Sequence, residues 1–271
     1  MALLLKTTYE AYKYARDDLK DPRTADWFLV HSPIPVIFIT AMYFFTVKEW
    51  LPKFMENRPA YDLRKVLVYY NLLQVVLSGY IVVMASTSLH TLNLTCSPVD
   101  YSDNPHAMNF AKLTWFYYMV KVVDLLDTVF FILRKKESQA TFLHIYHHFG
   151  MFFVGWVGTK YVAGGESVFV GIINSFVHVI MYSYYMFAAW KPEMKETIFK
   201  FKKHVTQLQL LQFMTLFCIY FPKLFTDCNF PKTLLIFVVP QDLTMIIMFG
   251  DFYYHAYIKG NGKKAQVKDT H

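Results

Sequence analysis

The sequence predicts an all-α, polytopic membrane protein with seven transmembrane helices in a single domain. Of its 271 residues 55% are hydrophobic and only 17% are charged, whereas about a quarter of the residues of a soluble domain are charged. The apolar runs are also about twice the length that a membrane-spanning strand needs, so helices are expected. Seven spans of about 20 residues would take up about half of the chain. We therefore expect residues 1–271 to form one membrane domain.

Seven apolar segments are long enough to cross the hydrocarbon core as helices. They are Phe28–Val47, Val66–Ser86, Phe110–Leu133, Thr141–Gly158, Val168–Ala189, His204–Phe221 and Thr233–Ile258. Some of these segments contain proline or glycine, which a helix in a membrane tolerates when its neighbours satisfy the freed backbone groups. Each segment is accordingly expected to be one transmembrane helix.

Positive charge is distributed unevenly over the connecting segments. Most of the 27 lysines and arginines lie between the first and second, third and fourth, and fifth and sixth segments, or after the seventh. Because basic loops stay in the cytosol, residues 1–27 are predicted to be lumenal and the tail 259–271 cytosolic. The basic residues of the N-terminal segment oppose this orientation. The net charge of +7 is attributed to orientation and to contact with membrane lipids, and no nucleic acid is expected as a partner.

Two cysteines and a glycosylation sequon fall on the predicted lumenal face. Cys96 and Cys228 lie in different loops there, where oxidising conditions permit a disulfide; two unrelated free thiols are the alternative. Cys218 lies inside the sixth segment and is expected to be a buried packing residue. Asn93 begins the sequence Asn-Leu-Thr and is a candidate glycosylation site.

The strongest polar signal is a cluster of histidines in the fourth segment. His144, His147 and His148 have the spacing i, i+3, i+4, which places three imidazoles on one face of a helix. One histidine there would be read as a hydrogen-bonded core residue. Three on one face, near the predicted cytosolic end of a span, indicate a reaction centre instead. We call these three residues the histidine box.

The third segment carries charged residues at helical spacing. Lys121, Asp124 and Asp127 follow one stripe, continued by Thr128, and one cation can partly neutralise two carboxylates. Two interpretations stay open. The stripe is either a buried ion-pair network that fixes helix packing, or a layer of groups that orients the histidines and sets their tautomers.

Polar residues also recur along the fifth and sixth segments. Those of the fifth are Asn174, His178, Tyr182 and Tyr185, and those of the sixth are Thr206, Gln209 and Gln212. His178 is the other histidine deep in a span, which favours a catalytic role. Amides and hydroxyls also join helices in membranes, so the stripe on the sixth segment is read as packing or as substrate lining.

Two other functions deserve comparison with a reaction at the histidine box. Membrane di-iron desaturases and hydroxylases share an HxxHH box but carry further boxes, which the scattered remaining histidines do not supply. A non-catalytic lipid transporter would line its path with such polar stripes, but the sequence shows no inverted repeat. No metal is therefore expected.

Four stretches together resemble the ELO-type family of very-long-chain fatty-acid elongases, and the likeness extends over nearly the whole chain. They are Lys121–Thr128, His144–His148, Asn174–Tyr185 and Thr206–Gln212. One departure is Asp124, where many members have glutamate; the change shortens the side chain but keeps its charge. The resemblance implies a seven-helix membrane protein in which six helices enclose a tunnel for the acyl chain.

The resemblance also implies a reaction. Such enzymes are acyltransferases of the endoplasmic reticulum that join malonyl-CoA to a long-chain acyl-CoA, giving 3-ketoacyl-CoA, CO2 and CoA without a cofactor. The middle histidine of the box, His147, would be the nucleophile that carries the acyl group, helped by His144 and His148. His178 and Asn174 would stabilise the developing negative charge. Partners would be the reductases and dehydratase that complete the cycle, and self-association into a homo-oligomer is left open.

Substrate contacts are expected at both ends of this arrangement. Tyr182, Tyr185 and the sixth-segment stripe would contact the substrate within the membrane. Arg134, Lys202 and Lys203 would attract the CoA phosphates from the cytosolic side, although they also fit a solvated basic rim.

Overall fold

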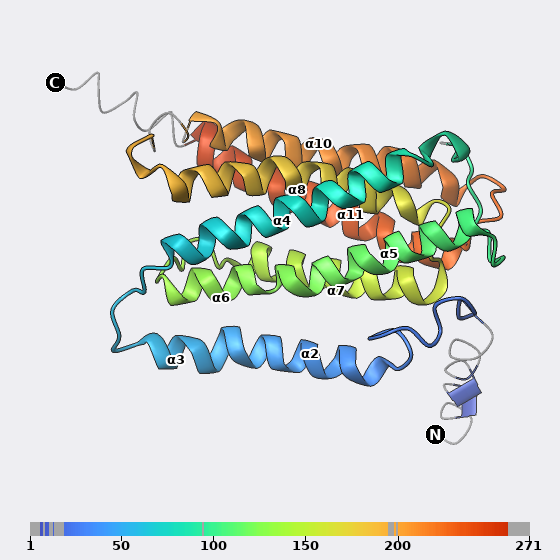
Figure 1. Cartoon of the computed structure of the whole chain (residues 1–271), viewed down its shortest axis with the longest axis horizontal. Helices are drawn as coiled ribbons and strands as arrows, with labels where there is room; N and C mark the ends of the chain where they lie inside the picture. Colours follow the sequence, from blue (N-terminus) through green and yellow to red (C-terminus); the bar gives the residue numbers. More distant parts are fainter. Residues whose placement is uncertain are drawn as a thin grey trace.

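The computed structural model describes residues 6–7, 9–10, 13, 19–93, 95–194, 198 and 200–259. Within these residues the regular structure is helical and contains no β-strand, so the predicted all-α class is confirmed. The long helices run along the longest axis of the molecule, and the connecting loops gather at its two ends (Figure 1). The predicted cytosolic tail beyond Lys259 and much of the predicted lumenal segment lie outside the described residues.

Nine α-helices and five shorter helical turns make up the described regular elements. The α-helices are α2 (Pro33–Phe45), α3 (Leu51–Met55), α4 (Arg64–Ser86), α5 (Pro105–Asp124), α6 (Leu126–Leu133), α7 (Phe142–Tyr161), α8 (Ser167–Trp190), α10 (Lys202–Tyr220) and α11 (Lys232–Tyr253). The π-helical turns are η1 (Thr46–Trp50) and η5 (Tyr254–Lys259), and the 3₁₀ turns are η2 (Leu89–Thr91), η3 (Pro192–Met194) and η4 (Phe221–Leu224).

The first helix begins and ends later than predicted. Residues 22–30 form turns, and α2 starts at Pro33, where the Ser32 hydroxyl caps the backbone N–H of Ile34 at 3.2 Å. Serine before proline is a strong start signal for a helix. The helix then continues through η1 and α3 to Met55. Glu49 and Lys53 form an exposed i, i+4 ion pair at 3.1 Å in this part, so these charged residues are compatible with a helix.

The third predicted helix is divided into α5 and α6. It begins at Pro105, where the side chain of Asn104 accepts a hydrogen bond from the N–H of Ala107 at 2.8 Å. A turn at Leu125 separates α5 from α6. The predicted continuous segment Phe110–Leu133 was wrong at this point, and the turn lies between the two acidic residues of the stripe.

Within the described residues, five helices are long and apolar enough to span a membrane, which supports a multi-pass membrane protein. They are Pro33–Met55, Arg64–Ser86, Ser167–Trp190, Lys202–Leu224 and Leu235–Lys259. The two other predicted spans are those that carry the charged stripe and the histidine box. Their polar residues lower the hydropathy on which a span is recognised, and the turn at Leu125 divides one of them. The count of seven spans stays a prediction.

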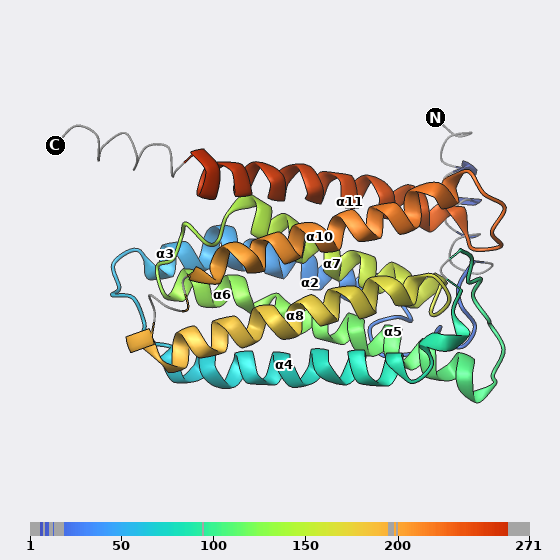
Figure 2. The same ribbon diagram turned by 90° about the horizontal axis from the view of Figure 1, so that it is seen from above.

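The helices close into a ring. Helix α4 packs along α8, α8 along α10 and α10 along α11; α11 then contacts α7, α7 contacts α5, and α5 returns to α4. Figure 2 shows α4, α8, α10 and α11 side by side in that order. Helices α2 and α3 flank α7 and α6 on one side (Figure 1). This ring matches the predicted six-helix enclosure, and an open tunnel through it stays a prediction.

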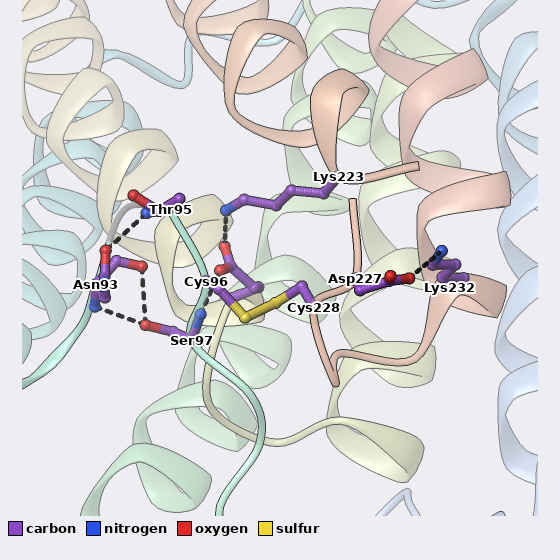
Figure 3. Close-up of a disulfide and its surroundings, with 9 residues drawn as sticks. Asn93, Thr95, Cys96, Ser97, Lys223, Asp227, Cys228 and Lys232 are labelled. Carbon is purple, nitrogen blue, oxygen red and sulfur yellow. Dashed lines mark hydrogen bonds and ion pairs between the residues drawn. A yellow bond between two sulfur atoms is a disulfide. The ribbon is translucent and has the colours of Figure 1, made fainter. Parts of the chain in front are cut away.

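One end of the bundle is joined by a disulfide and a buried ion pair (Figure 3). Cys96, in the loop after α4, is bonded to Cys228, in the loop before α11, as expected from the sequence. Beside it Lys223 pairs with Glu166, which also accepts a hydrogen bond from the backbone of Ser97 at 2.6 Å. Three connecting segments are thereby held together.

Two further predictions concern the burial of Cys218 and the glycosylation of Asn93. Cys218 is exposed on α10, so the prediction of a buried packing residue was wrong. An apolar thiol can face the outside of a membrane protein at little cost because its surroundings there are hydrocarbon. Asn93 is exposed in the loop next to the disulfide, and its glycosylation stays a prediction.

Candidate active site at the histidine box

The predicted polar residues come together near one end of the helix ring. Helix α7 begins after Thr141, whose hydroxyl accepts a hydrogen bond from the N–H of His144 at 3.3 Å. This cap fixes the first turns of α7, where the histidine box lies. Side chains of the neighbouring helices surround it, among them residues of α6, α10 and α11.

The three histidines share one face, as their spacing predicts. The ring centroids of His144 and His148 are 4.1 Å apart, and those of His147 and His148 are 5.8 Å apart. Nε2 of His144 lies 3.1 Å from Oγ1 of Thr128, and that hydroxyl is 2.7 Å from the hydroxyl of Tyr43 on α2. The outer helix α2 thus reaches the box through a hydroxyl pair.

His147 differs from its two neighbours in its surroundings. Its ring packs edge-on against Phe213 of α10 and Phe249 of α11, at centroid distances of 5.8 and 6.1 Å. Its Nδ1 is buried and has no hydrogen-bond partner among the described residues. A buried polar atom without a partner is costly in a folded protein, and at a functional site it marks a place for a ligand. His147 is therefore the histidine of the box with a buried ring nitrogen that no described residue contacts by a hydrogen bond.

Asp124 is held by two neighbours. Its carboxylate pairs with Nζ of Lys121 at 2.7 Å and accepts a hydrogen bond from Nε2 of Gln74 on α4 at 2.5 Å. Nδ1 of His178 lies 3.4 Å from the Lys121 ammonium and 3.7 Å from Asp124. All four side chains are buried. The ion pair therefore contacts the catalytic candidate on α8.

Asp127 connects the charged stripe with the box. Its Oδ2 accepts a hydrogen bond from the hydroxyl of Tyr182 at 2.6 Å and lies 3.8 Å from Nε2 of His148. The same tyrosine hydroxyl is 3.3 Å from Asp124. One tyrosine of α8 thus bridges the two acidic residues across the turn at Leu125. This geometry favours the orienting role for the stripe, while its ion pairs also link the helices.

Asn174 links three helices one turn from His178. Its Oδ1 accepts a hydrogen bond from the hydroxyl of Tyr117 at 2.9 Å, and its Nδ2 donates to Oε1 of Gln212 at 3.3 Å. An amide nitrogen carries two hydrogens, so a second donor remains on Asn174. Gln212 is therefore the member of the sixth-segment stripe that the structure brings to this group.

The remaining predicted residues lie around this centre. Gln209 donates to the sulfur of Met181 at 3.2 Å, and the hydroxyl of Thr206 lies 3.4 Å from that of Tyr257. The Tyr185 ring is 6.5 Å from that of Tyr182 and is 38% exposed. Contacts of this kind are typical of residues that pack neighbouring helices together.

The predicted phosphate-binding bases lie at the same end of the bundle as the box. Arg134 caps the end of α6, and Lys202 and Lys203 begin α10. The Lys203 ammonium lies 5.8 Å above the ring of Tyr253.

Sequence reasoning missed several residues of the site. Gln74 and Tyr70 of α4 are joined at 3.0 Å and belong to the network of Asp124. Tyr146, inside the histidine box, donates to Gln241 of α11 at 2.7 Å. The sequence does contain a signal for the two glutamines, because each is an amide inside an apolar run. Such a group in a membrane needs a hydrogen-bond partner on another helix.

Within the described part of the chain, no three His, Cys, Asp or Glu side chains are grouped so as to hold a metal ion.

Comparison with known proteins gives the family. Residues 28–265 match ELO, the GNS1/SUR4 family. The chain is 38% identical to a very long chain fatty acid elongase of Aedes aegypti, over 100% of this chain and 76% of the relative. It is 39% identical to very long chain fatty acid elongase 7 of Drosophila melanogaster and 39% identical to elongase 4 of Homo sapiens. Each match covers 96% of this chain, with 80% and 83% of the respective relative. The resemblance to the elongase family is thereby confirmed, and the chain belongs to the GNS1/SUR4 family.

Proposed function

We propose that this chain is the condensing enzyme of a fatty-acid elongation cycle and that His147 carries the acyl group during the reaction. It joins malonyl-CoA to a long-chain acyl-CoA and yields 3-ketoacyl-CoA, CO2 and CoA. Membership of the GNS1/SUR4 family and the names of the relatives support the reaction. The unpartnered ring nitrogen of His147 is the observation that supports the covalent route.

The first half-reaction transfers the acyl group to the enzyme. A neutral imidazole nitrogen of His147 attacks the thioester carbonyl without prior ionisation. The carbon–sulfur bond breaks, and CoA leaves as a thiol after taking up the proton of the imidazole. The product is an acyl-imidazole, which is itself an activated acyl donor.

The second half-reaction forms the new carbon–carbon bond. Malonyl-CoA loses CO2, and the electron pair of the broken bond becomes an enolate. The enolate carbon attacks the acyl carbonyl, the carbon–nitrogen bond breaks, and His147 takes up a proton from the medium. The two half-reactions together consume one proton and regenerate the enzyme, so no redox cofactor is needed.

Neighbouring groups have supporting roles in both steps. His148 is positioned by Asp127 at 3.8 Å and His144 by Thr128 at 3.1 Å, so both can fix the tautomer of their neighbour or move its proton. His178 contacts Lys121 and Asp124 through Nδ1, which would leave Nε2 for the substrate. This nitrogen and the second amide hydrogen of Asn174 would stabilise the oxyanion or the enolate.

The cosubstrates would enter from the basic end of the bundle. Arg134, Lys202 and Lys203 would attract the CoA phosphates there. This end would then face the cytosol, and the disulfide end would face the lumen of the endoplasmic reticulum. The 3-keto product must be reduced, dehydrated and reduced again by separate enzymes. Those enzymes are the proposed partners.

The reaction is tested by incorporation of radiolabelled malonyl-CoA by purified protein with a panel of acyl-CoAs. The wild type should incorporate label into 3-ketoacyl-CoA with at least one long-chain substrate. His147→Ala should lower incorporation at least a thousandfold if the acyl group is carried by His147. A wild type that incorporates nothing with any acyl-CoA would contradict the proposed reaction.

A further inference from the structure

An acidic residue of α11 has no role in the proposed reaction. Asp242 is only 6% exposed and lies within the candidate span Leu235–Lys259. Its Oδ2 is buried and has no hydrogen-bond partner among the described residues. Whether a carboxyl group is ionised or neutral, at least one oxygen accepts a hydrogen bond. An acidic side chain inside a membrane is expensive and by default indicates a functional site.

Two tyrosine hydroxyl groups that interact with Asp242 do not supply the missing donor. Asp242 interacts electrostatically with Tyr117 of α5 and Tyr220 of α10. The Tyr117 hydroxyl, however, donates to Oδ1 of Asn174 at 2.9 Å, and the Tyr220 hydroxyl donates to the backbone oxygen of Glu166 at 2.7 Å. Both tyrosine protons are therefore already used, and among the described residues no group donates to Oδ2 of Asp242.

Asp242 lies deeper in the helix ring than the nucleophile. The adjacent Gln241 is in contact with α7 at Gly150, where an added Cβ would be 2.9 Å from Nε2 of Gln241. Gly150 is three residues, or about 4.5 Å, further along α7 than His147. Phe249, which packs on the His147 ring, is seven residues beyond Asp242, or about 10 Å along α11. Along the helix axes, Asp242 is thus about one to two turns from His147.

A small cavity lies beside the two tyrosines with which Asp242 interacts. Its volume is about 30 Å³, and Tyr117, Tyr220 and Val238 are among its lining residues. Val238 precedes Asp242 by four residues and therefore shares its helix face. An acyl chain that extends from His147 into the ring would pass Asp242 before it reached this cavity.

We propose that Asp242 determines substrate specificity by selecting acyl chains that carry a hydroxyl group at its depth. The inference rests on the proposed function. A plain alkyl chain offers no hydrogen-bond donor and leaves the buried oxygen unpaired, whereas a hydroxyl group on the chain donates to it. Leaving such an acceptor unpaired lowers the preference by about tenfold to a hundredfold. The substrate class assigned to the site is therefore a hydroxyacyl-CoA.

The test uses the purified full chain and acyl-CoAs of one length, either unsubstituted or with the hydroxyl group moved stepwise along the chain. For the wild type, kcat/KM should peak at one or two adjacent hydroxyl positions, about tenfold or more above the unsubstituted substrate. Asp242→Leu should abolish the peak and improve use of the unsubstituted chain. Asp242→Asn, which keeps an acceptor oxygen, should retain part of the peak.

Two further measurements keep the test decisive. Leu243→Ala changes an exposed neighbour on the same helix and should leave the profile unchanged. In the inactive His147→Ala background, the best hydroxyacyl-CoA should raise Tm more than the unsubstituted one does, and Asp242→Leu should remove that difference. This binding readout remains valid if the proposed reaction fails. A flat profile with no Tm difference, or a peak that persists in Asp242→Leu, would overturn the proposal and indicate that a buried water serves the carboxyl group.

Discussion

At the scale of single residues, the site combines groups that are saturated with partners and groups that are not. Asp124 is bound by Lys121 and Gln74, whereas Nδ1 of His147 and Oδ2 of Asp242 have no partner in the described chain. Saturated groups fix the geometry, and unsaturated ones are free to bind a ligand. The proposed roles of His147 and Asp242 follow from this difference.

Asp127→Asn should lower turnover about tenfold to a hundredfold while the protein stays folded. The change keeps the shape of the side chain but removes the charge that faces His148 at 3.8 Å and accepts from Tyr182. Loss of an orienting partner of a functional histidine has an effect of this size. The measurement is kcat by malonyl-CoA incorporation, together with size-exclusion chromatography in detergent.

Asp26→Asn is the matched control, because the side chain of Asp26 is 93% exposed; its turnover should equal that of the wild type. If Asp127→Asn is as active as this control, the stripe serves helix packing alone. The same holds if Asp127→Asn aggregates.

At the scale of helices, local sequence signals mark where helices begin. Other differences from the predicted segments arise from contacts between residues that are far apart in the sequence. Ser32-Pro33 and Asn104-Pro105 mark the observed starts of α2 and α5, but the predictions placed these starts at the onset of apolar character. The turn at Leu125 and the role of Gln74 depend on packing between helices. A single sequence does not contain that information at identifiable positions.

The histidine box was the most predictable part of the site. Its spacing of i, i+3, i+4 determines the shared face regardless of how the helices pack, and the observed ring distances agree with it. The groups around the box were harder to predict. Tyr43, which reaches it through Thr128, and Gln74, which binds Asp124, belong to helices far away in the sequence. Each looks like an ordinary polar interruption of an apolar run.

Close packing of α5 against α7 gives a prediction about helix contacts. A Cβ on Gly155 would lie 3.3 Å from the ring and 3.4 Å from Cα of Tyr118, whereas one on Gly158 would meet nothing within 4 Å. Gly155→Val should therefore be less stable than Gly158→Val by about 1–3 kcal/mol. Both changes place the same residue in the same helix, so the difference reports the contact with α5. Thermal unfolding in detergent measures it, and equal Tm values would show that α5 can move away freely.

At the scale of the whole molecule, one end of the ring is joined covalently and the other carries the chemistry. The bond between Cys96 and Cys228 closes a loop with a sequence separation of 132 residues, next to the buried pair of Glu166 and Lys223. Both cysteines could be assigned to one face from the distribution of charge alone. Their neighbours, such as Glu166, could not, because nothing in the sequence shows that this loop meets the other two.

Cys96→Ser should lower Tm by several degrees and leave catalysis at low temperature intact. For a loop of this length the chain-entropy model gives about 4–5 kcal/mol, and insertion in the membrane already restricts the unfolded chain, so the effect should be smaller. Cys218→Ser, at the exposed thiol of α10, should have no effect on Tm. Peptide mapping without reductant should recover Cys96 and Cys228 as one linked pair; recovery of both as free thiols would refute the bond.

The central claim is that His147 carries the acyl group, and incubation with acyl-CoA alone tests it most directly. The wild type should release about one equivalent of CoA before any malonyl-CoA is added. Mass spectrometry after rapid quenching should find the acyl mass on His147, within the peptide that contains His144–His148. His147→Ala should release no CoA under the same conditions. If the wild type releases no CoA until malonyl-CoA is added and carries no adduct, the acyl-imidazole is contradicted, and His147 acts as a base in a direct condensation.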